Sequence, residues 1–255
     1  MFRAIRIFLL LLILVFVGLS AWLTQARSTD WNNSLWVKVY PINADGSEQS
    51  ARHIEQLKPE HFASIEAFIS REARRYGHSI EQPVRIELGD KINEQPPELG
   101  DSPNMLGALA WSLRMRLWVA SVTDDDIDPD VRIFLRYHRP VFDVPLENSV
   151  GMQKGMYGIV NAFASRQSRG SNNVIIAHEF LHTLGASDKY DPATGLPVAP
   201  HGLAEPDRSP LYPQRKAEIM GGRIALSAGN AEIPRSLKLA VIGPETAREV
   251  RLLSD

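Results

Sequence analysis

The chain has 255 residues, 44% of them hydrophobic, and a formal net charge of -2 at pH 7. A charge this close to zero argues against a nucleic-acid partner, because phosphates require clustered cations. The chain contains no cysteine, which excludes disulfides and thiolate ligands and leaves histidine and carboxylate side chains as the expected metal ligands.

The N-terminus carries an apolar run from residue 7 to residue 23, preceded by Arg3 and Arg6. A run of about 17 residues is the minimum for a membrane-spanning helix, and the early arginines favour a cytoplasmic N-terminus. We therefore expect residues 1–27 to be an uncleaved signal anchor, a single-pass transmembrane helix with the remainder on the exported side, periplasmic or extracellular. Cleavage near Ala26, which would yield a secreted protein, is the alternative.

Residues 28–255 contain no comparable apolar run, and we expect them to form an α+β domain. Four strands are predicted, at residues 35–42, 84–88, 131–137 and 157–164, and apolar and polar residues alternate in the first two. Pro41 indicates that the first of them is an edge strand or ends there. Helical periodicity predicts two helices, at residues 59–76 and 105–119. In the second of these, Trp111 and Trp118 are expected to be core residues.

The acidic segment at residues 123–130 is expected to be a solvated turn. It does not fit a calcium loop of the EF-hand type, because Pro129 and Leu135 stand where that loop requires glycine and glutamate. Residues 189–217 are rich in proline and predict a loop region. After a break at Gly243, a last helix is expected at residues 245–253.

The most informative motif begins at His178 and runs through Glu179 to His182. On a helix, the two histidines lie one turn apart on the same face and can bind one metal ion. Glu179 points to a neighbouring sector, where its carboxylate can accept a hydrogen bond from a metal-bound water. Gly185 is expected to end the helix, because glycine readily takes a positive φ. Asp188 then follows as the expected third ligand, which leaves the fourth position open for water.

The start of this helix is expected just before its apolar residues. Side-chain oxygens there can cap unpaired helix amides, and the candidates are Ser171, Asn172 and Asn173. Three other residues are alternative candidates for the third ligand: Asp191, His201 and Glu218. Glu205 has the spacing of a ligand on a second helix, but Pro206 and Pro210 disfavour a helix there.

This motif resembles the signature of the metzincin clan of zinc metallopeptidases, in the minority variant that ends in Asp. Members carry a methionine turn downstream, and the matching residue here is Met220, between Ile219 and Gly221. The resemblance covers about the last third of the chain closely, and upstream it extends to a compatible order of elements. It implies a twisted mixed sheet, an active-site helix and a loop-rich C-terminal part. It also implies that an extended peptide pairs with the strand before the helix, at residues 157–164, or with its neighbour.

In two well-known metzincin families, a tyrosine two residues after the methionine approaches the metal. Here that position is Gly222, so the resemblance assigns no oxyanion-stabilising group. Three residues of the loop region are candidates for contact with a substrate carbonyl: Tyr190, His201 and Tyr212.

Together these features predict an exported, membrane-anchored zinc metallopeptidase. His178, His182 and Asp188 would bind Zn²⁺, and Glu179 would act as general base and proton shuttle. The expected substrate is a peptide or protein. A zinc amidase acting on cell-wall peptides and a non-catalytic metal-binding assembly protein are the alternatives. The free carboxylate of Glu179 argues against the latter, because a structural zinc site uses four protein ligands.

Overall fold

A computed structural model describes residue 6 and residues 31–98, 105–141 and 149–253. The helices and strands follow one another in this order: β1 (Leu35–Asn43), α2 (Glu48–Glu55), α3 (Ala63–Arg75), β2 (Val84–Leu88), α4 (Met105–Val122), β3 (Val131–His138), β4 (Val150–Met152), β5 (Tyr157–Phe163), α5 (Arg169–Thr183), β6 (Ala217–Glu218), β7 (Ile224–Ser227), β8 (Asn230–Glu232), β9 (Ala240–Val241) and α6 (Pro244–Glu249).

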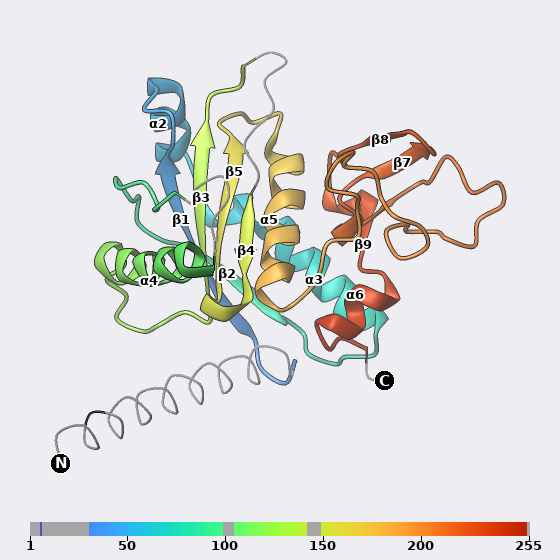
Figure 1. The fold of residues 1–255 in the computed structure, drawn as a ribbon, viewed down its shortest axis with the longest axis horizontal. Helices are drawn as coiled ribbons and strands as arrows, with labels where there is room; N and C mark the ends of the chain where they lie inside the picture. Colours follow the sequence, from blue (N-terminus) through green and yellow to red (C-terminus); the bar gives the residue numbers. More distant parts are fainter. Residues whose placement is uncertain (1–5, 7–30, 99–104, 142–148, 254–255) are drawn as a thin grey trace.

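The centre of the fold is a five-stranded mixed sheet with the strand order β2-β1-β3-β5-β4 (Figure 1). The first four strands in this order pair in parallel, and β4 pairs antiparallel with β5. The predicted α+β class with a mixed sheet is therefore confirmed. The edge strand beside helix α5 is β4. It pairs with β5, the strand predicted at residues 157–164.

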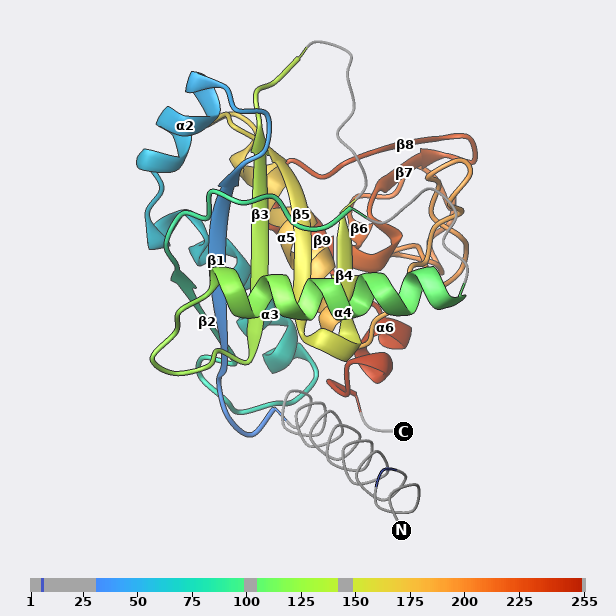
Figure 2. The same cartoon turned by 60° about the vertical axis from the view of Figure 1, so that its left-hand side comes forward.

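Helices cover both faces of this sheet. Helices α3 and α5 lie on one face, and α4 crosses the other face (Figure 2). Alternate residues of β1 show why both faces are apolar: Val37 and Val39 belong to the cluster on the α3 and α5 side, whereas Tyr40 and Ile42 belong to the cluster on the α4 side. Successive side chains of a strand point to opposite faces, so β1 contributes apolar residues to both hydrophobic cores.

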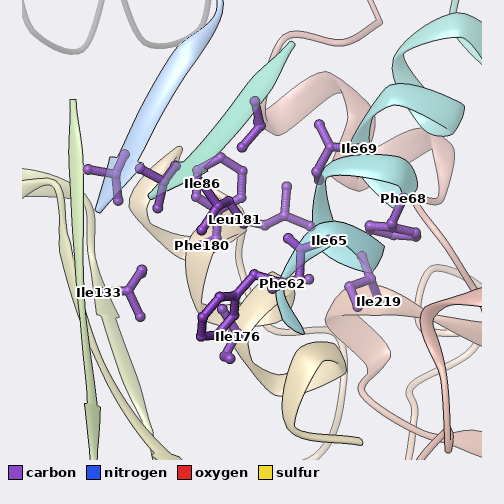
Figure 3. Close-up of a cluster of buried hydrophobic side chains, with 14 of the residues drawn as sticks. Phe62, Ile65, Phe68, Ile69, Ile86, Ile133, Ile176, Phe180, Leu181 and Ile219 are labelled. Atoms are coloured by element: carbon purple, nitrogen blue, oxygen red, sulfur yellow. The ribbon is translucent and has the colours of Figure 1, made fainter. Parts of the chain in front are cut away.

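The larger core fills the space between the sheet and helices α3 and α5 (Figure 3). Phe68 and Ile69 of α3 and Phe180 and Leu181 of α5 are fully or almost fully buried there. Trp111 and Trp118 of α4 lie in the smaller cluster, as expected. Helix α5 is therefore held between a sheet and another helix, which gives its side chains fixed positions.

Strand β1 is a central strand, so the alternative of an edge strand at Pro41 was wrong, and the strand ends two residues later, at Asn43. Its pairing with β2 ends at Val39, opposite Leu88, whereas its pairing with β3 continues to Asn43. Pro41 lies beyond the β2 ladder, and its carbonyl accepts a hydrogen bond from the amide of Ile92. The missing N–H of proline therefore removes no bond from the ladder with β2.

Helix α5 begins earlier than its predicted caps. Its first residue is Arg169, and Ser168 occupies the N-cap position without a side-chain cap bond. Asn172 lies inside the helix, and its side chain accepts from the amide of Phe163 and donates to the carbonyl of the same residue. The amide of Asn173 donates to the carbonyl of His61. Both asparagines therefore join α5 to neighbouring segments instead of capping it.

Other element boundaries also differ from the predictions. Helix α2 and the short strand β4 were not predicted, because neither has a long enough apolar pattern. The segment 59–76 divides into a 3-10 turn at Pro59–His61 and helix α3. The last helix α6 ends at Glu249, and Arg251 has a φ of 58°. A positive φ at that residue prevents the helix from continuing to residue 253.

The C-terminal part is rich in loops, as predicted, and its strands are short. Strand β6 pairs with β9, and β7 pairs with β8. The predicted membrane anchor at residues 1–27 lies, apart from Arg6, outside the described residues. Within the residues that the structure describes, no helix combines the length and apolar character that a membrane crossing requires.

Candidate metal centre

Helix α5 supplies the first two candidate ligands and the candidate base. His178 and Glu179 are 8% and 5% exposed, and His182 is partly buried. The helix ends at Thr183, and Gly185 has a φ of 105°. This left-handed residue turns the chain back, as predicted, so that Asp188 returns to the histidines.

The three predicted ligands lie together. The Nε2 atoms of His178 and His182 are 3.1 Å apart. Asp188 Oδ1 lies 3.2 Å from the first of these nitrogens and 3.1 Å from the second. Metal–ligand bonds of about 2.0–2.2 Å at tetrahedral angles separate ligand atoms by about 3.3–3.5 Å. The triangle formed by the three atoms is only slightly tighter than that.

Hydrogen bonds to the other ring nitrogens orient both imidazoles. His178 Nδ1 lies 2.9 Å from the carbonyl oxygen of Ile219, and His182 Nδ1 lies 2.7 Å from that of Ala186. A carbonyl can only accept, so each Nδ1 carries the proton and each Nε2 presents a lone pair to the centre of the triangle. Two lone pairs and a carboxylate oxygen meet there, which is an arrangement that a cation stabilises.

The electrostatic surroundings also favour a cation. Partial burial raises the pKa of Asp188, but the adjacent imidazoles of His178 and His182 outweigh it and hold this pKa well below the usual range. Burial lowers the pKa of His182, but Asp188 and Glu179 outweigh this effect and raise it above its ordinary value. Asp188 is therefore ionised, and the site attracts positive charge.

Glu179 has an unpartnered oxygen beside the ligand triangle. Its Oε2 atom is buried and makes no hydrogen bond within the described part of the chain. Burial raises the pKa of Glu179, while the two histidines and the amide of Gly151 act in the opposite direction. A buried carboxylate oxygen without a donor requires an explanation. A water molecule bound at the ligand triangle would provide that donor.

Strand β4 approaches α5 closely enough to require glycine at position 151. A Cβ atom on Gly151 would lie 2.4 Å from the carbonyl oxygen of Glu179 and 2.6 Å from Cβ of His182. Both distances are far below van der Waals contact, so another residue here would displace the strand or the helix. Gly151 thus permits its own amide to reach the carboxylate of Glu179.

The predicted methionine turn lies next to the ligands. Met220 is fully buried, and its carbonyl accepts a hydrogen bond from the amide of Lys189 at 2.9 Å. The preceding residue, Ile219, accepts the hydrogen bond from His178. The turn is therefore bonded both to the first ligand and to the residue after Asp188.

Glu218 organises this turn and is not a ligand. Its side chain is fully buried. Its Oε2 accepts from the amides of Met220 and Gly221 at 2.6 and 2.8 Å. Its Oε1 accepts from the amide of Gly243 and the hydroxyl of Thr246 at 2.9 and 2.8 Å. Burial raises the pKa of Glu218, whereas the hydrogen bonds from Gly243, Thr246 and Gly221 lower it. With all four lone-pair sites in use, the carboxylate has no capacity left for a metal ion.

Glu249 of helix α6 holds the loop that carries Asp188. Its carboxylate accepts from the amide of Ser187 at 3.1 Å and from Lys189 Nζ at 2.6 Å. These two residues flank Asp188 in the chain. The last helix therefore positions the third ligand from more than 60 residues away in sequence, a contact that local spacing cannot reveal.

The ligand triangle opens onto a cavity of about 500 Å³. Its described lining residues include His178, Glu179 and Tyr190, but neither His201 nor Tyr212. The ring centroids of Tyr190 and His178 are 6.2 Å apart. Burial, followed by the charge of Asp188 and the hydrogen bond to it, raises the pKa of Tyr190 to about 12. Of the three candidates for substrate contact, the fold brings only Tyr190 to this cavity.

Two of the alternative third ligands are placed elsewhere. The group of histidine and acidic side chains that can hold a metal ion, among described residues, consists of His178, His182 and Asp188. Asp191 is engaged in its own turn, where its carboxylate accepts from the amide of Ala193 at 2.7 Å. His201 is exposed.

Comparison with known proteins gives limited information. No protein-family model and no curated protein matches the chain. Crystal structures of wild-type OgpA from Akkermansia muciniphila, in two crystal forms, are similar at a TM-score of 0.38 and 12% identity, over 84% of this chain. The chain spans 58% of the length of OgpA. A similarity this low does not indicate a shared activity. The function proposed below rests on the residues of the site.

Proposed function

We propose that the chain is a zinc-dependent metallopeptidase of the metzincin-like type. The observation that carries the proposal is the ligand triangle together with the unpartnered Oε2 of Glu179 at its side. A structural site would use a fourth protein ligand, whereas three ligands beside a free carboxylate leave one position for a reactant. The adjoining cavity supports this view, because its volume of about 500 Å³ lies within the range of ligand sites.

The donor set fits zinc. Two imidazole nitrogens and one carboxylate oxygen are ligands that zinc accepts in tetrahedral catalytic sites. Both imidazoles are fixed by backbone carbonyls, and such outer contacts also hold the correct ring nitrogen towards the metal. When bound, the ion would polarise the scissile carbonyl and lower the pKa of a water molecule towards neutrality.

Glu179 is the proposed general base. Its Oε2 accepts the proton of the attacking water, and the same carboxyl group then gives the proton to the leaving amine. Burial raises the pKa of Glu179, which favours uptake of the water proton by this carboxylate. The amide of Gly151 holds the carboxylate in this orientation.

Tyr190 is the proposed donor to the developing oxyanion. It lines the cavity beside His178, and its pKa of about 12 keeps the hydroxyl protonated at neutral pH. A Cβ atom on Gly222 would lie 3.9 Å from the Tyr190 ring. Gly222 stands where two metzincin families have a tyrosine. In this chain Tyr190, from the loop after Asp188, lies next to that position.

The proposed location of the protein rests on the composition of its N-terminal segment. We propose a single-pass anchor at residues 1–27 with the domain on the exported side, as the arginines and the apolar run favour. Fractionation of cells that produce the full chain, with protease added from the exported side, tests this placement. Digestion of the domain in intact cells would be expected, and protection would contradict the proposal.

The decisive experiment combines metal analysis with peptide cleavage. The full chain in detergent is expected to bind one zinc per molecule and to cleave members of a random peptide library, with loss of cleavage after chelation. Glu179→Gln is expected to retain zinc and to lower kcat by about 100-fold or more. Cell-wall peptides tested in parallel distinguish the amidase alternative. A zinc-bound chain that cleaves neither substrate class would indicate an assembly protein.

A further inference from the structure

The cavity beside the ligand triangle contains one charged side chain that the proposed reaction does not use. Its walls come from helix α5, from the C-terminal end of β5 and from two loop segments, residues 190–195 within the proline-rich region and residues 221–223 after it. Among the described lining residues, the ionisable ones are His178, Glu179, Tyr190 and Arg223. The first three belong to the site already described. Arg223 remains.

Arg223 lies in the cavity without an internal partner. It is half-buried and makes no hydrogen bond or ion pair in the described part of the chain. Two other arginines of the C-terminal part are paired: Arg215 lies 3.1 Å from Glu205, and Arg248 lies 3.0 Å from Glu245. A guanidinium that is partly withdrawn from water and left unpaired is a recognition group for an anion.

The backbone that carries Arg223 has a defined position. Met220 and Gly221, just before it, are held by the carboxylate of Glu218. Ile224, just after it, pairs with Glu232 in the β7–β8 ladder. Arg223 thus stands between a buried turn and a strand, so its side chain extends from a fixed base into the cavity.

The guanidinium lies against Gly195 on the opposite loop. A Cβ atom on Gly195 would be 3.5 Å from both Nε and Nη2 of Arg223. The rest of the wall is mixed: Phe163, Val174 and Ile233 are apolar, and the polar lining residues Ser149, Asn161 and Thr194 carry no charge. A wall with several apolar side chains and one cation, Arg223, suits a side chain that has a hydrocarbon stem and a terminal carboxylate.

We propose that Arg223 selects peptides that carry a carboxylate side chain, aspartate or glutamate, next to the scissile bond. This inference rests on the proposed peptidase function, because His178 and Glu179 line the same cavity and define where the bond is cleaved. The substrate carboxylate pairs with the guanidinium through two parallel N–H···O bonds. Arg223 determines specificity and takes no part in the chemical step.

The test uses the full, zinc-loaded chain and peptides that differ at one residue. Library profiling locates the cleaved bond, and peptides with Glu, Gln or Lys at each flanking position are then compared. At one of these positions the Glu peptide is expected to have a kcat/KM about tenfold or more above that of the Gln peptide, since a hydrogen-bonded charge pair is lost with Gln. Arg223→Gln should abolish this difference, and Arg223→Glu should reverse it in favour of Lys.

Arg235→Glu is the matched control. Arg235 is exposed and is not among the described lining residues of the cavity. The same charge reversal there should leave the preference for Glu unchanged. Equal cleavage of Glu and Gln peptides, or a preference that survives Arg223→Gln, would overturn the inference and leave the peptidase function standing.

A binding measurement separates the inference from the function. The same peptides, labelled with a fluorophore, are titrated with the zinc-loaded Glu179→Gln chain. If no peptide is cleaved by the wild-type chain, yet the Glu peptide binds about tenfold more tightly than the Gln peptide and loses this advantage in Arg223→Gln, only the proposed reaction fails. If cleavage and selective binding are both absent, both proposals are wrong.

Discussion

Lys189 and Glu249 form a largely buried ion pair that joins the loop of the third metal ligand to the last helix. Lys189 Nζ lies 2.6 Å from Glu249 Oε2, and the Lys189 side chain is only 6% exposed. Ser187, on the other side of Asp188, donates its amide to the same carboxylate. The position of Asp188 is therefore set by a residue that lies close to the end of the chain.

Glu249→Gln should weaken zinc binding by about tenfold, because loss of an outer contact that orients a ligand typically costs this much in affinity. Competition with a chromophoric chelator measures the affinity. Glu245→Gln on the same helix is the control, since Glu245 is 41% exposed and pairs only with Arg248 among described residues. Equal affinities of the wild type and Glu249→Gln would show that Asp188 needs no such support.

Zinc should stabilise the folded chain through His178, His182 and Asp188. At a free zinc concentration of 100 times Kd, the gain in unfolding free energy is about 2.7 kcal/mol. Thermal unfolding with and without zinc measures it. His182→Ala and Asp188→Ala should remove the effect, whereas His201→Ala and Asp191→Ala should retain it. Loss of the effect in either of the last two variants would assign the third ligand differently.

Gly151→Ala should reduce activity and stability together. The added Cβ would meet the backbone of Glu179 and the side chain of His182, and such overpacking costs about 1–3 kcal/mol. Urea denaturation and peptide cleavage measure the two effects. Gly229→Ala is the matched control, because a Cβ there meets no atom within 4 Å. A Gly151→Ala chain as stable and active as Gly229→Ala would contradict the close approach of β4.

Glu218→Gln should destabilise the fold by about 2–4 kcal/mol, because the amide nitrogen would face donors where the carboxylate oxygen now accepts. Two of the four hydrogen bonds would be lost in the buried turn. Chemical denaturation measures the change. Glu232→Gln, at an exposed position of β8, should change stability by less than about 0.5 kcal/mol. Similar effects at both positions would argue against the structural role of Glu218.

We expect the ionised carboxylate of Asp125 to stabilise the folded chain by an amount that depends on pH. Burial raises the pKa of Asp125, but Lys38 Nζ and the Tyr40 hydroxyl, each 2.6 Å from its Oδ1, outweigh burial and lower this pKa below its ordinary value. The acidic segment at residues 123–130 was predicted to be a solvated turn. Asp125 departs from this prediction, because its side chain is only 3% exposed. Its folded-state pKa is depressed, so its contribution is present above about pH 4 and is lost as the pH falls through the folded-state pKa.

Asp125→Asn should accordingly cost about 2–3 kcal/mol at pH 7, somewhat less than a fully buried pair because Lys38 and Arg132 retain some exposure. The difference from the wild type should shrink below about pH 4. Urea denaturation across this pH range measures it. Asp126→Asn, at the exposed neighbouring position, should be nearly neutral at every pH. A cost that does not depend on pH would show that the ionised form of Asp125 is not what stabilises the fold.

Local patterns were enough to predict the main elements of the fold. The strands β1, β2, β3 and β5 and the helix α5 have apolar periodicities that act over a few residues, and these were found close to their predicted bounds. The ligand set was predictable for the same reason. His178 and His182 are one helical turn apart, and Gly185 returns the chain at a fixed short distance to Asp188.

The partners that hold these residues in place lie far away in the sequence, and their contacts have no local signal. Gly151 lies in β4, a strand that the sequence did not predict. A glycine in a strand can mark a close approach of two backbones, but this signal is visible only once the strand is known. Glu218 was a possible ligand from its residue type alone. Only burial and four donors identify it as the support of the methionine turn.

The sequence by itself thus determined the α+β class, the helix with two histidines and a glutamate, and the acid that follows it, because helix geometry converts spacing directly into position. The tertiary structure alone decided three further points: that Tyr190 lines the cavity, that Glu249 holds the third-ligand loop, and that Arg223 stands unpaired in the described part of the cavity wall. These depend on how separate segments pack against each other, and packing is set by the whole core rather than by neighbouring residues.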